Sequence, residues 1–181
     1  MFRTCAKLSA LALSVLLPTA LLAPGATAVR FPNGRVAFDQ APRLVRSATS
    51  SVSSNNGVTY QFTLEVPAGA GEPLKAVNIS QRQSIDTVEF QANQSEAFIG
   101  DTFAGGPDLS LAAVGGAVEA GEMTVVFDPP IQPGNTVTIS VEPDHNPFNG
   151  GAYLFGITAF PDGENSLGQF IGHGRVHVLD F

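Results

Sequence analysis

The chain has 181 residues, no Trp, and nine Lys and Arg against sixteen Asp and Glu, which gives a net charge of −7 at pH 7. This acidic balance disfavours a nucleic-acid partner, because phosphate binding needs a basic surface, and it equally disfavours electrostatic docking onto anionic lipid. The single cysteine is Cys5, so the rest of the chain is excluded from thiol catalysis, zinc–thiolate sites and disulfide formation.

The first 28 residues have the features of a signal peptide. Arg3 and Lys7 give a positive start, a long apolar run follows, and residues 26–28 match the small-x-small pattern that signal peptidase cleaves. We therefore expect a mature chain of residues 29–181 that is exported to the periplasm or the extracellular space. Removing the two cations from the net charge of −7 leaves −9 on this mature chain. No later apolar run reaches the roughly 20 residues needed to span a bilayer.

Short apolar or alternating segments follow one another through the mature chain. They predict strands over residues 58–66, 77–81, 123–127, 135–141, 152–160 and 168–181, separated by turns rich in Gly and Pro. Beyond the signal peptide, no segment has a helical period over three turns. The order predicts an all-β fold: one domain, a single antiparallel β-sandwich of immunoglobulin-like style with about seven to nine strands.

The alternation also predicts which side of a strand is buried. Phe62 and Ile139 are expected to point into the core from two different strands, because each lies in a run of apolar residues two apart. Gln61 and Thr138 are expected on the opposite, solvated face. Replacing either of these two polar residues with Ala should then have little effect on stability.

Three other segments shape the expected strand boundaries. Asp128-Pro129-Pro130 is expected to end the strand that begins at Met123, because proline cannot donate to a sheet ladder. Residues 109–120, rich in Ala and Gly, are compatible with a short helix or a hairpin. Residues 47–56, which are rich in Ser and Asn, are compatible with a mobile loop or an edge strand.

The connection over residues 142–151 carries the most candidate ligand groups. Glu142, Asp144, Asn146 and Asn149 offer oxygen atoms of the kind that calcium prefers. Their spacing lacks the DxDxDG order of a calcium loop, and two prolines in the same connection already account for a rigid turn. These four residues are therefore the metal candidates, and no cofactor is predicted.

The same connection is the candidate interaction surface. Its prolines restrict the backbone, so polar groups on it would be presented to a partner with little ordering cost. Sugar binding there would have to use Phe or Tyr for stacking, because the chain has no Trp. The side chains expected to contact a partner are Asp144, Asn146, Phe148, Asn149 and Tyr153.

No catalytic constellation can be assigned from the sequence. No G-x-S-x-G motif precedes a helix, and the paired carboxylates of a glycosidase could meet only in three dimensions. His173 and His177 are four residues apart on a predicted strand, which separates them by about 13 Å and prevents both from binding one zinc ion. The prediction is therefore a protein without enzymatic activity.

Several stretches between residues 31 and 177 match a pattern found in one known group of proteins. They are residues 32–36, 38–39, 42–44, 71–74, 79–82, 127–130, 133–134, 146–147, 150–161 and 168–175. In these stretches the chain resembles the small exported cyanobacterial proteins grouped as domain of unknown function 2808. The resemblance implies a cyanobacterial source and an envelope or extracellular location. It implies no catalytic residues, because the activity of that family is itself unknown.

Together these features predict an exported, non-enzymatic envelope or extracellular protein that binds another protein or a surface polymer, such as a polysaccharide. Two alternatives stay open. One is a carbohydrate- or cation-binding module centred on residues 142–151, and the other is a hydrolase whose carboxylates meet only in the folded chain. The oligomeric state is not predicted by the sequence.

Overall fold

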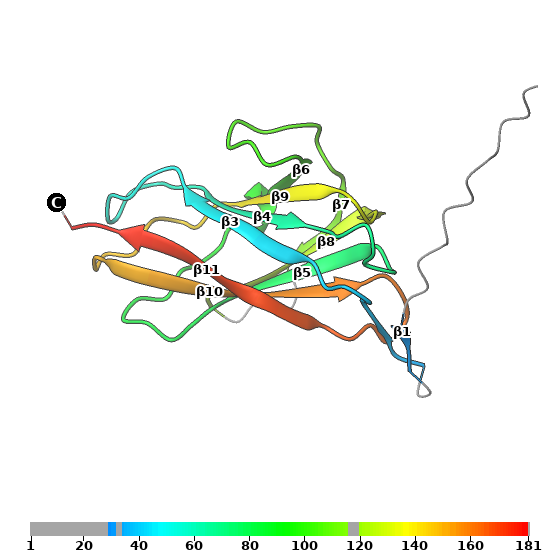
Figure 1. Cartoon of the computed structure of the whole chain (residues 1–181). Helices are drawn as coiled ribbons and strands as arrows, with labels where there is room; N and C mark the ends of the chain where they lie inside the picture. Colours follow the sequence, from blue (N-terminus) through cyan, green and yellow to red (C-terminus); the bar gives the residue numbers. More distant parts are fainter. Residues whose placement is uncertain (1–28, 32–33, 116–119, 181) are drawn as a thin grey trace, which may run out of the picture.

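A computed structural model describes residues 29–31, 34–115 and 120–180 and shows two β-sheets packed face to face (Figure 1). The predicted signal peptide over residues 1–28 lies outside the described residues. The elements are β1 (Val29–Arg30), β2 (Val36–Ala37), β3 (Arg43–Thr49), β4 (Tyr60–Glu65), β5 (Leu74–Gln81), the 3₁₀ turn η1 (Ala92–Gln94), β6 (Glu96–Ile99), β7 (Leu111–Gly115), β8 (Glu122–Ile131), β9 (Thr136–Val141), β10 (Gly151–Pro161) and β11 (Gln169–Val178).

The two main sheets form an antiparallel sandwich. One has five strands in the order β11-β10-β5-β8-β7, and the other has four in the order β3-β4-β9-β6; β1 and β2 form a separate small hairpin. Every strand pair within these sheets is antiparallel. The predicted all-β, immunoglobulin-like sandwich is confirmed. The described residues contain no helix with the length and apolar character needed to cross a membrane.

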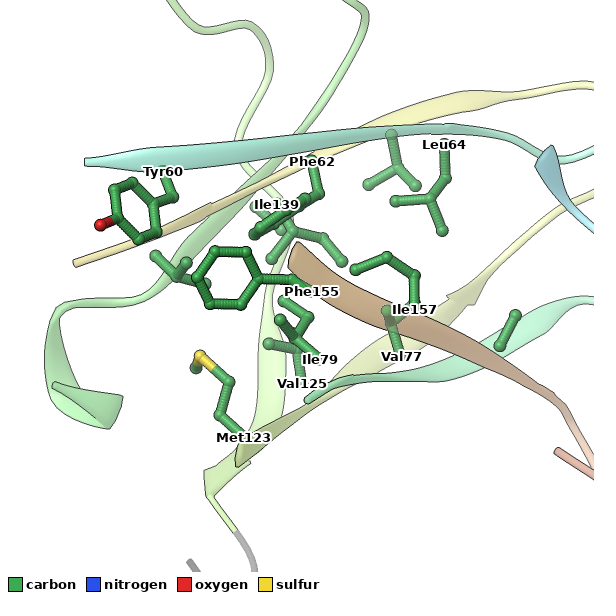
Figure 2. Packing of buried hydrophobic residues seen from close by; sticks show 14 of the residues in the cluster. Tyr60, Phe62, Leu64, Val77, Ile79, Met123, Val125, Ile139, Phe155 and Ile157 are labelled. Atoms are coloured by element: carbon green, nitrogen blue, oxygen red, sulfur yellow. The ribbon is translucent and has the colours of Figure 1, made fainter. Parts of the chain in front are cut away.

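The core lies between the two sheets and is organised around Phe155 of β10. Its ring centroid is 5.6 Å from that of Tyr60, 5.8 Å from that of Phe62 and 5.9 Å from that of Phe90. Figure 2 shows Phe155 lying between the aromatic side chains of β4 and the aliphatic side chain of Ile79 on β5. Aromatic rings at these distances add to the stabilisation that comes from burying their area.

The predicted inward faces of β4 and β9 are confirmed. Phe62 and Ile139 are opposite each other in the β4–β9 ladder, and both are fully buried. The prediction of a solvated opposite face is wrong. Gln61 is 5 % exposed and Thr138 is fully buried, because the chain after β6 folds over this face. Gln61 Nε2 donates to the carbonyl of Phe103 at 3.2 Å.

Close packing against aromatic rings explains two glycines in the C-terminal strand region. A Cβ atom on Gly174 of β11 would lie 2.5 Å from Cε1 of Phe62, and one on Gly168 would lie 2.5 Å from Cε1 of Phe160. Neither distance is possible for a real Cβ atom, so a side chain at either position would displace a ring. These glycines are required for the approach of the neighbouring side chains.

The prediction that Asp128-Pro129-Pro130 ends its strand is also wrong, because β8 continues to Ile131. The β5–β8 register explains how the prolines are accommodated. Ala76 is opposite Val126, and the next pair along the ladder is Leu74 with Ile131. The prolines therefore fall in an irregularity of the ladder, where no N–H donor is needed.

Residues 47–56 and 109–120 contain strands that the hydrophobic pattern does not reveal. Residues 47–49 belong to the edge strand β3, and the loop that follows takes up the rest of residues 47–56. Within residues 109–120, Leu111–Gly115 forms β7, and residues 116–119 lie outside the described part of the chain. β3, β6 and β7 escape prediction because they are short, polar or rich in alanine, and a register shift interrupts β3.

The buried hydroxyl of Thr138 provides a test of the covered sheet face. It donates to the carbonyl of Gly100 at 2.8 Å and lies 2.9 Å from the hydroxyl of Thr63. We expect Thr138→Val to lower the free energy of unfolding by about 1–3 kcal/mol, because the substitution removes the hydroxyl that bonds the Gly100 carbonyl and the Thr63 hydroxyl. Thr136→Val, on the same face of β9 and half-buried, should change it by less than about 0.5 kcal/mol. Equal midpoints of urea unfolding for the two variants would contradict the covered face.

Candidate functional site

The candidate site lies at one end of the sandwich, where three connections meet. These are the β9–β10 connection, the β3–β4 connection and the loop that follows β5, and they lie at the same end as the C-terminus (Figure 1). Hydrogen bonds join the first connection to each of the other two. The positions of these loops are therefore set by contacts between segments far apart in the sequence.

Asn146 anchors the β9–β10 connection and is fully buried. Its Oδ1 accepts a hydrogen bond from the hydroxyl of Tyr60 at 2.8 Å. Its Nδ2 donates to the carbonyl of Ser51 at 3.1 Å and to that of Ser53 at 2.8 Å. The backbone N–H of Asn146 donates to the carbonyl of Asn56 at 2.8 Å. A buried amide whose donors and acceptor are all used holds the two connections together at a fixed distance.

The environment of Tyr60 keeps this arrangement intact. Burial, with a smaller effect of the nearby Tyr153, raises the pKa of the Tyr60 hydroxyl far above its usual range. The hydroxyl therefore keeps its proton and donates to Asn146 throughout the physiological pH range. Because the ring of Tyr60 also packs against that of Phe155, with the two rings tilted by 53°, the anchor is connected directly to the core.

A second set of hydrogen bonds joins the β9–β10 connection to the loop after β5. The carboxylate of Asp86 accepts from the backbone N–H of Asn149 at 2.8 Å and from Asn149 Nδ2 at 3.0 and 3.1 Å. The hydroxyl of Tyr153 donates to the carbonyl of Asn149 at 2.7 Å and lies 3.4 Å from Asp86 Oδ2. The three side chains form a clamp between the two loops, which we call the Asp86 clamp.

Charge and hydrogen bonding shift the pKa values within the Asp86 clamp. The N–H of Asn149 is the main cause that lowers the pKa of Asp86, because it stabilises the carboxylate form. Desolvation, followed by the negative charge of Asp86, raises the pKa of Tyr153. Asp86 is therefore an anion and Tyr153 a neutral donor at neutral pH.

A groove of about 350 Å³ opens between the two clamped loops. Its walls carry two large apolar side chains that are exposed, Ile85 at 83 % and Phe148 at 60 %. The ring of His145 lies against Phe148, with centroids 4.8 Å apart. The residues lining the groove are Ile85, Asp86, Thr87, Glu89, Asp144, His145, Pro147 and Phe148.

A second hollow, of about 600 Å³, lies beside η1 and β7. Small and polar side chains such as Ala92, Asn93 and Ser95 form much of its lining, and its two leucines are half-buried. The smaller groove is the better candidate, because large apolar side chains are exposed on its walls and hydrogen bonds between loops support it.

The four candidate cation ligands have separate roles in the structure. Asn146 uses its Oδ1 within the anchor, and Asn149 is held by the Asp86 clamp. Glu142 Oε1 lies 3.5 Å from the hydroxyl of Thr59, and Asp144 faces the groove. Within residues 29–31, 34–115 and 120–180, no three His, Cys, Asp or Glu side chains gather as a metal site.

The predicted interaction surface is only partly exposed. Asp144, Phe148 and Asn149 are at the surface, whereas Asn146 is fully buried and Tyr153 is 2 % exposed. These last two residues support the loop from within. Their polar side-chain atoms form hydrogen bonds within the protein, so burial does not deprive them of hydrogen-bond partners.

Sequence reasoning missed the other wall of the groove, residues 85–89. The only local signal is Ile85, an isolated large apolar residue in a polar stretch that follows a strand. Nothing in the sequence places this residue near Phe148, since the two are brought together by the Asp86 clamp. His173 and His177 lie elsewhere, both exposed on β11.

Comparison with known proteins identifies a family but no activity. A family model described as "Protein of unknown function (DUF2808)" matches residues 35–178. No curated protein matches the chain.

Several solved structures are similar to this chain at low sequence identity. The C-terminal domain of the Streptococcus pyogenes antigen I/II-family protein AspA has a TM-score of 0.41 and 13 % identity; the match covers 74 % of this chain and 47 % of that one. The collagen-binding domain of a Staphylococcus aureus adhesin has a TM-score of 0.38 and 8 % identity, covering 71 % and 97 %. An uncharacterized Nocardia farcinica protein with an immunoglobulin-like fold has a TM-score of 0.39 and 11 % identity, covering 74 % and 96 %.

The Asp86 clamp makes a prediction about pH. Because the pKa of Asp86 is lowered in the folded protein, its stabilisation is present above the unfolded value of about 3.9 and is lost as pH falls through the folded value. We expect Asp86→Asn to lower the urea midpoint at about pH 7, and the difference from the parent to disappear by about pH 2. Asp144→Asn is the control, since this exposed carboxylate is outside the clamp. A parent–variant difference that stays constant over this range would contradict the clamp.

Proposed function

The chain belongs to the DUF2808 family of proteins of unknown function. Because membership of this family assigns no activity, we propose a function from the geometry of the molecule. The protein is an exported, non-enzymatic β-sandwich module that binds another protein. The binding site is the groove between residues 85–89 and residues 144–148. The expected mature chain, residues 29–181, carries this site outside the cytoplasm.

The observation that carries the proposal is the pair of exposed apolar side chains on the walls of the groove. Ile85 and Phe148 expose 83 % and 60 % of their surfaces, although both belong to loops that are tied to the fold. Exposed apolar groups rimmed by polar residues are typical of protein-binding sites. Aromatic residues are also enriched at such sites, because a ring buries a large area with few rotatable bonds.

The support beneath the groove favours binding as well. The Asn146 anchor and the Asp86 clamp fix the loop on both sides of Phe148, so the side chain is presented on a rigid backbone. A site ordered before binding loses less conformational entropy when its partner arrives. The loop therefore behaves as a preformed surface.

The alternatives have less support from the same residues. A carbohydrate- or cation-binding loop would use the amides of Asn146 and Asn149, but these already bond Tyr60 and Asp86 within the fold. A hydrolase would need a proton donor and a base around one bond of a bound substrate; Glu89 and Asp144 both line the groove, but so do the exposed apolar side chains of Ile85 and Phe148. The apolar walls are better suited to the side chains of a protein.

A photo-crosslinking amino acid placed at Phe148 in the native host tests the proposal. We expect a discrete adduct with a partner protein after irradiation, and recovery of the adduct from the envelope or the medium with Val29 as the N-terminal residue. Phe170 on β11 is a matched control position, because it is 59 % exposed on a different face. We expect no such adduct from this position.

Ile85→Ser provides the second control, because it removes the opposite wall of the groove without touching the crosslinker. We expect it to reduce the adduct at Phe148 strongly while the melting temperature stays unchanged, since Ile85 is exposed. Identical adducts from positions 148 and 170 would contradict the groove as the site. Recovery of the protein in the cytoplasm with residues 1–28 attached would contradict export.

A further inference from the structure

The charge of the groove points to the chemistry of its partner. Three carboxylates line it, from Asp86, Glu89 and Asp144. None of its lining residues, all of which belong to the described part of the chain, is Lys or Arg. The groove therefore combines apolar walls with three carboxylates and a single imidazole, that of His145, and its lining has no Lys or Arg to balance the negative charge.

Backbone pairing brings two of these carboxylates together. Phe90 and Pro143 are antiparallel bridge partners, and the N–H of Asp144 donates to the carbonyl of Glu89 at 2.9 Å. This register places Glu89 directly opposite Asp144, one residue from the bridge on each segment. Phe90 packs inward against Phe155, so the side chains of Glu89 and Asp144 leave the short ladder on its other face, toward the groove.

Like charges directly opposite each other on a sheet are unfavourable. Cβ atoms of opposite residues lie about 4.5–5.5 Å apart, so the carboxylates of Glu89 and Asp144 repel each other unless a cation lies between them. Both side chains are exposed in the protein alone, where water screens the repulsion. A partner that covers the groove removes this water and must supply the compensating charge.

The third carboxylate adds a fixed negative charge beside the apolar walls. Hydrogen bonds from Asn149 lower the pKa of Asp86, which therefore stays ionised at neutral pH. These bonds occupy its oxygens on the clamp side. Asp86 therefore contributes to the negative potential in the groove, and Glu89 and Asp144 are the groups that would contact a cation directly.

We infer that the groove binds a segment of a partner protein carrying Lys or Arg next to a large apolar residue. The cationic group lies between Glu89 and Asp144, and the apolar side chain packs between Ile85 and Phe148. The inference rests on the proposed function, because it names the chemistry of the partner for that same groove. Association is then faster at low salt, as complementary charges steer the partner to the site.

Selection from a displayed library of random dodecapeptides against the purified protein tests the inference. We expect the enriched peptides to share Lys or Arg adjacent to Leu, Ile, Phe or Met. One enriched peptide is then synthesised, together with a copy in which the cationic residue is replaced by norleucine. Fluorescence anisotropy should show about tenfold weaker binding of the norleucine copy, which is the loss expected for two exposed ion pairs.

Three double variants separate the inference from the proposed function. Glu89→Gln with Asp144→Asn should weaken binding of the cationic peptide about tenfold and leave binding of the norleucine copy unchanged. Asp162→Asn with Glu164→Gln makes the same change in net charge in the β10–β11 turn and should have no effect. Ile85→Ser with Phe148→Ser should abolish binding of both peptides.

Each outcome supports or overturns a defined statement. Enrichment of acidic or uncharged peptides, or unchanged binding after Glu89 and Asp144 are neutralised, overturns the cationic partner and leaves the groove as the site. Binding that survives the loss of Ile85 and Phe148 overturns the groove itself. A library with no enriched peptide overturns recognition of a linear segment, and melting temperatures equal to that of the parent show that every variant remains folded.

Discussion

The hydrogen bond from the Tyr60 hydroxyl to Asn146 Oδ1 is the contact on which the candidate site depends. It joins a core strand to a loop, and the same amide reaches the carbonyls of Ser51 and Ser53 in a second loop. Any apolar replacement of Asn146 would leave the buried hydroxyl of Tyr60 without its acceptor, at a cost of about 1–3 kcal/mol, and would also remove the hydrogen bonds to the carbonyls of Ser51 and Ser53. The end of the sandwich is therefore organised from within, by a residue that contacts no solvent.

Two levels of support separate the surface from the core. The Asn146 anchor fixes the β9–β10 connection to the β3–β4 connection, and the Asp86 clamp fixes it to the loop after β5. Phe148 lies between the two attachments, on a backbone that both of them restrict. Ile85 is next to Asp86 in the chain, so the clamp also determines where the opposite wall lies. The groove is thus a consequence of polar contacts, although its walls are apolar.

The sequence predicts the central strands well because their apolar residues alternate over a buried face. It does not reveal that Gln61 and Thr138 are covered, since the segment that covers them is irregular, rich in glycine and distant in the chain. Asn146 lies in a segment whose composition is that of an ordinary surface turn, and only the contact with Tyr60 shows that its side chain is buried. The glycine-rich strand β11 is recognisable as a pattern, yet the reason for Gly174 is a ring on β4. These failures share one cause: each depends on a contact between residues far apart in the sequence.

Amide hydrogen exchange in Tyr60→Phe is the most direct test of the central claim that the Tyr60–Asn146 contact holds the binding end together. The substitution keeps the ring against Phe155 and removes only the hydroxyl. We predict faster exchange at the N–H groups of Asn55 and Asn146, which bond between the two connections, with unchanged exchange in the ladders of β5 and β10. Unchanged exchange at the two loop amides would contradict the account, as would a uniform increase over the whole protein.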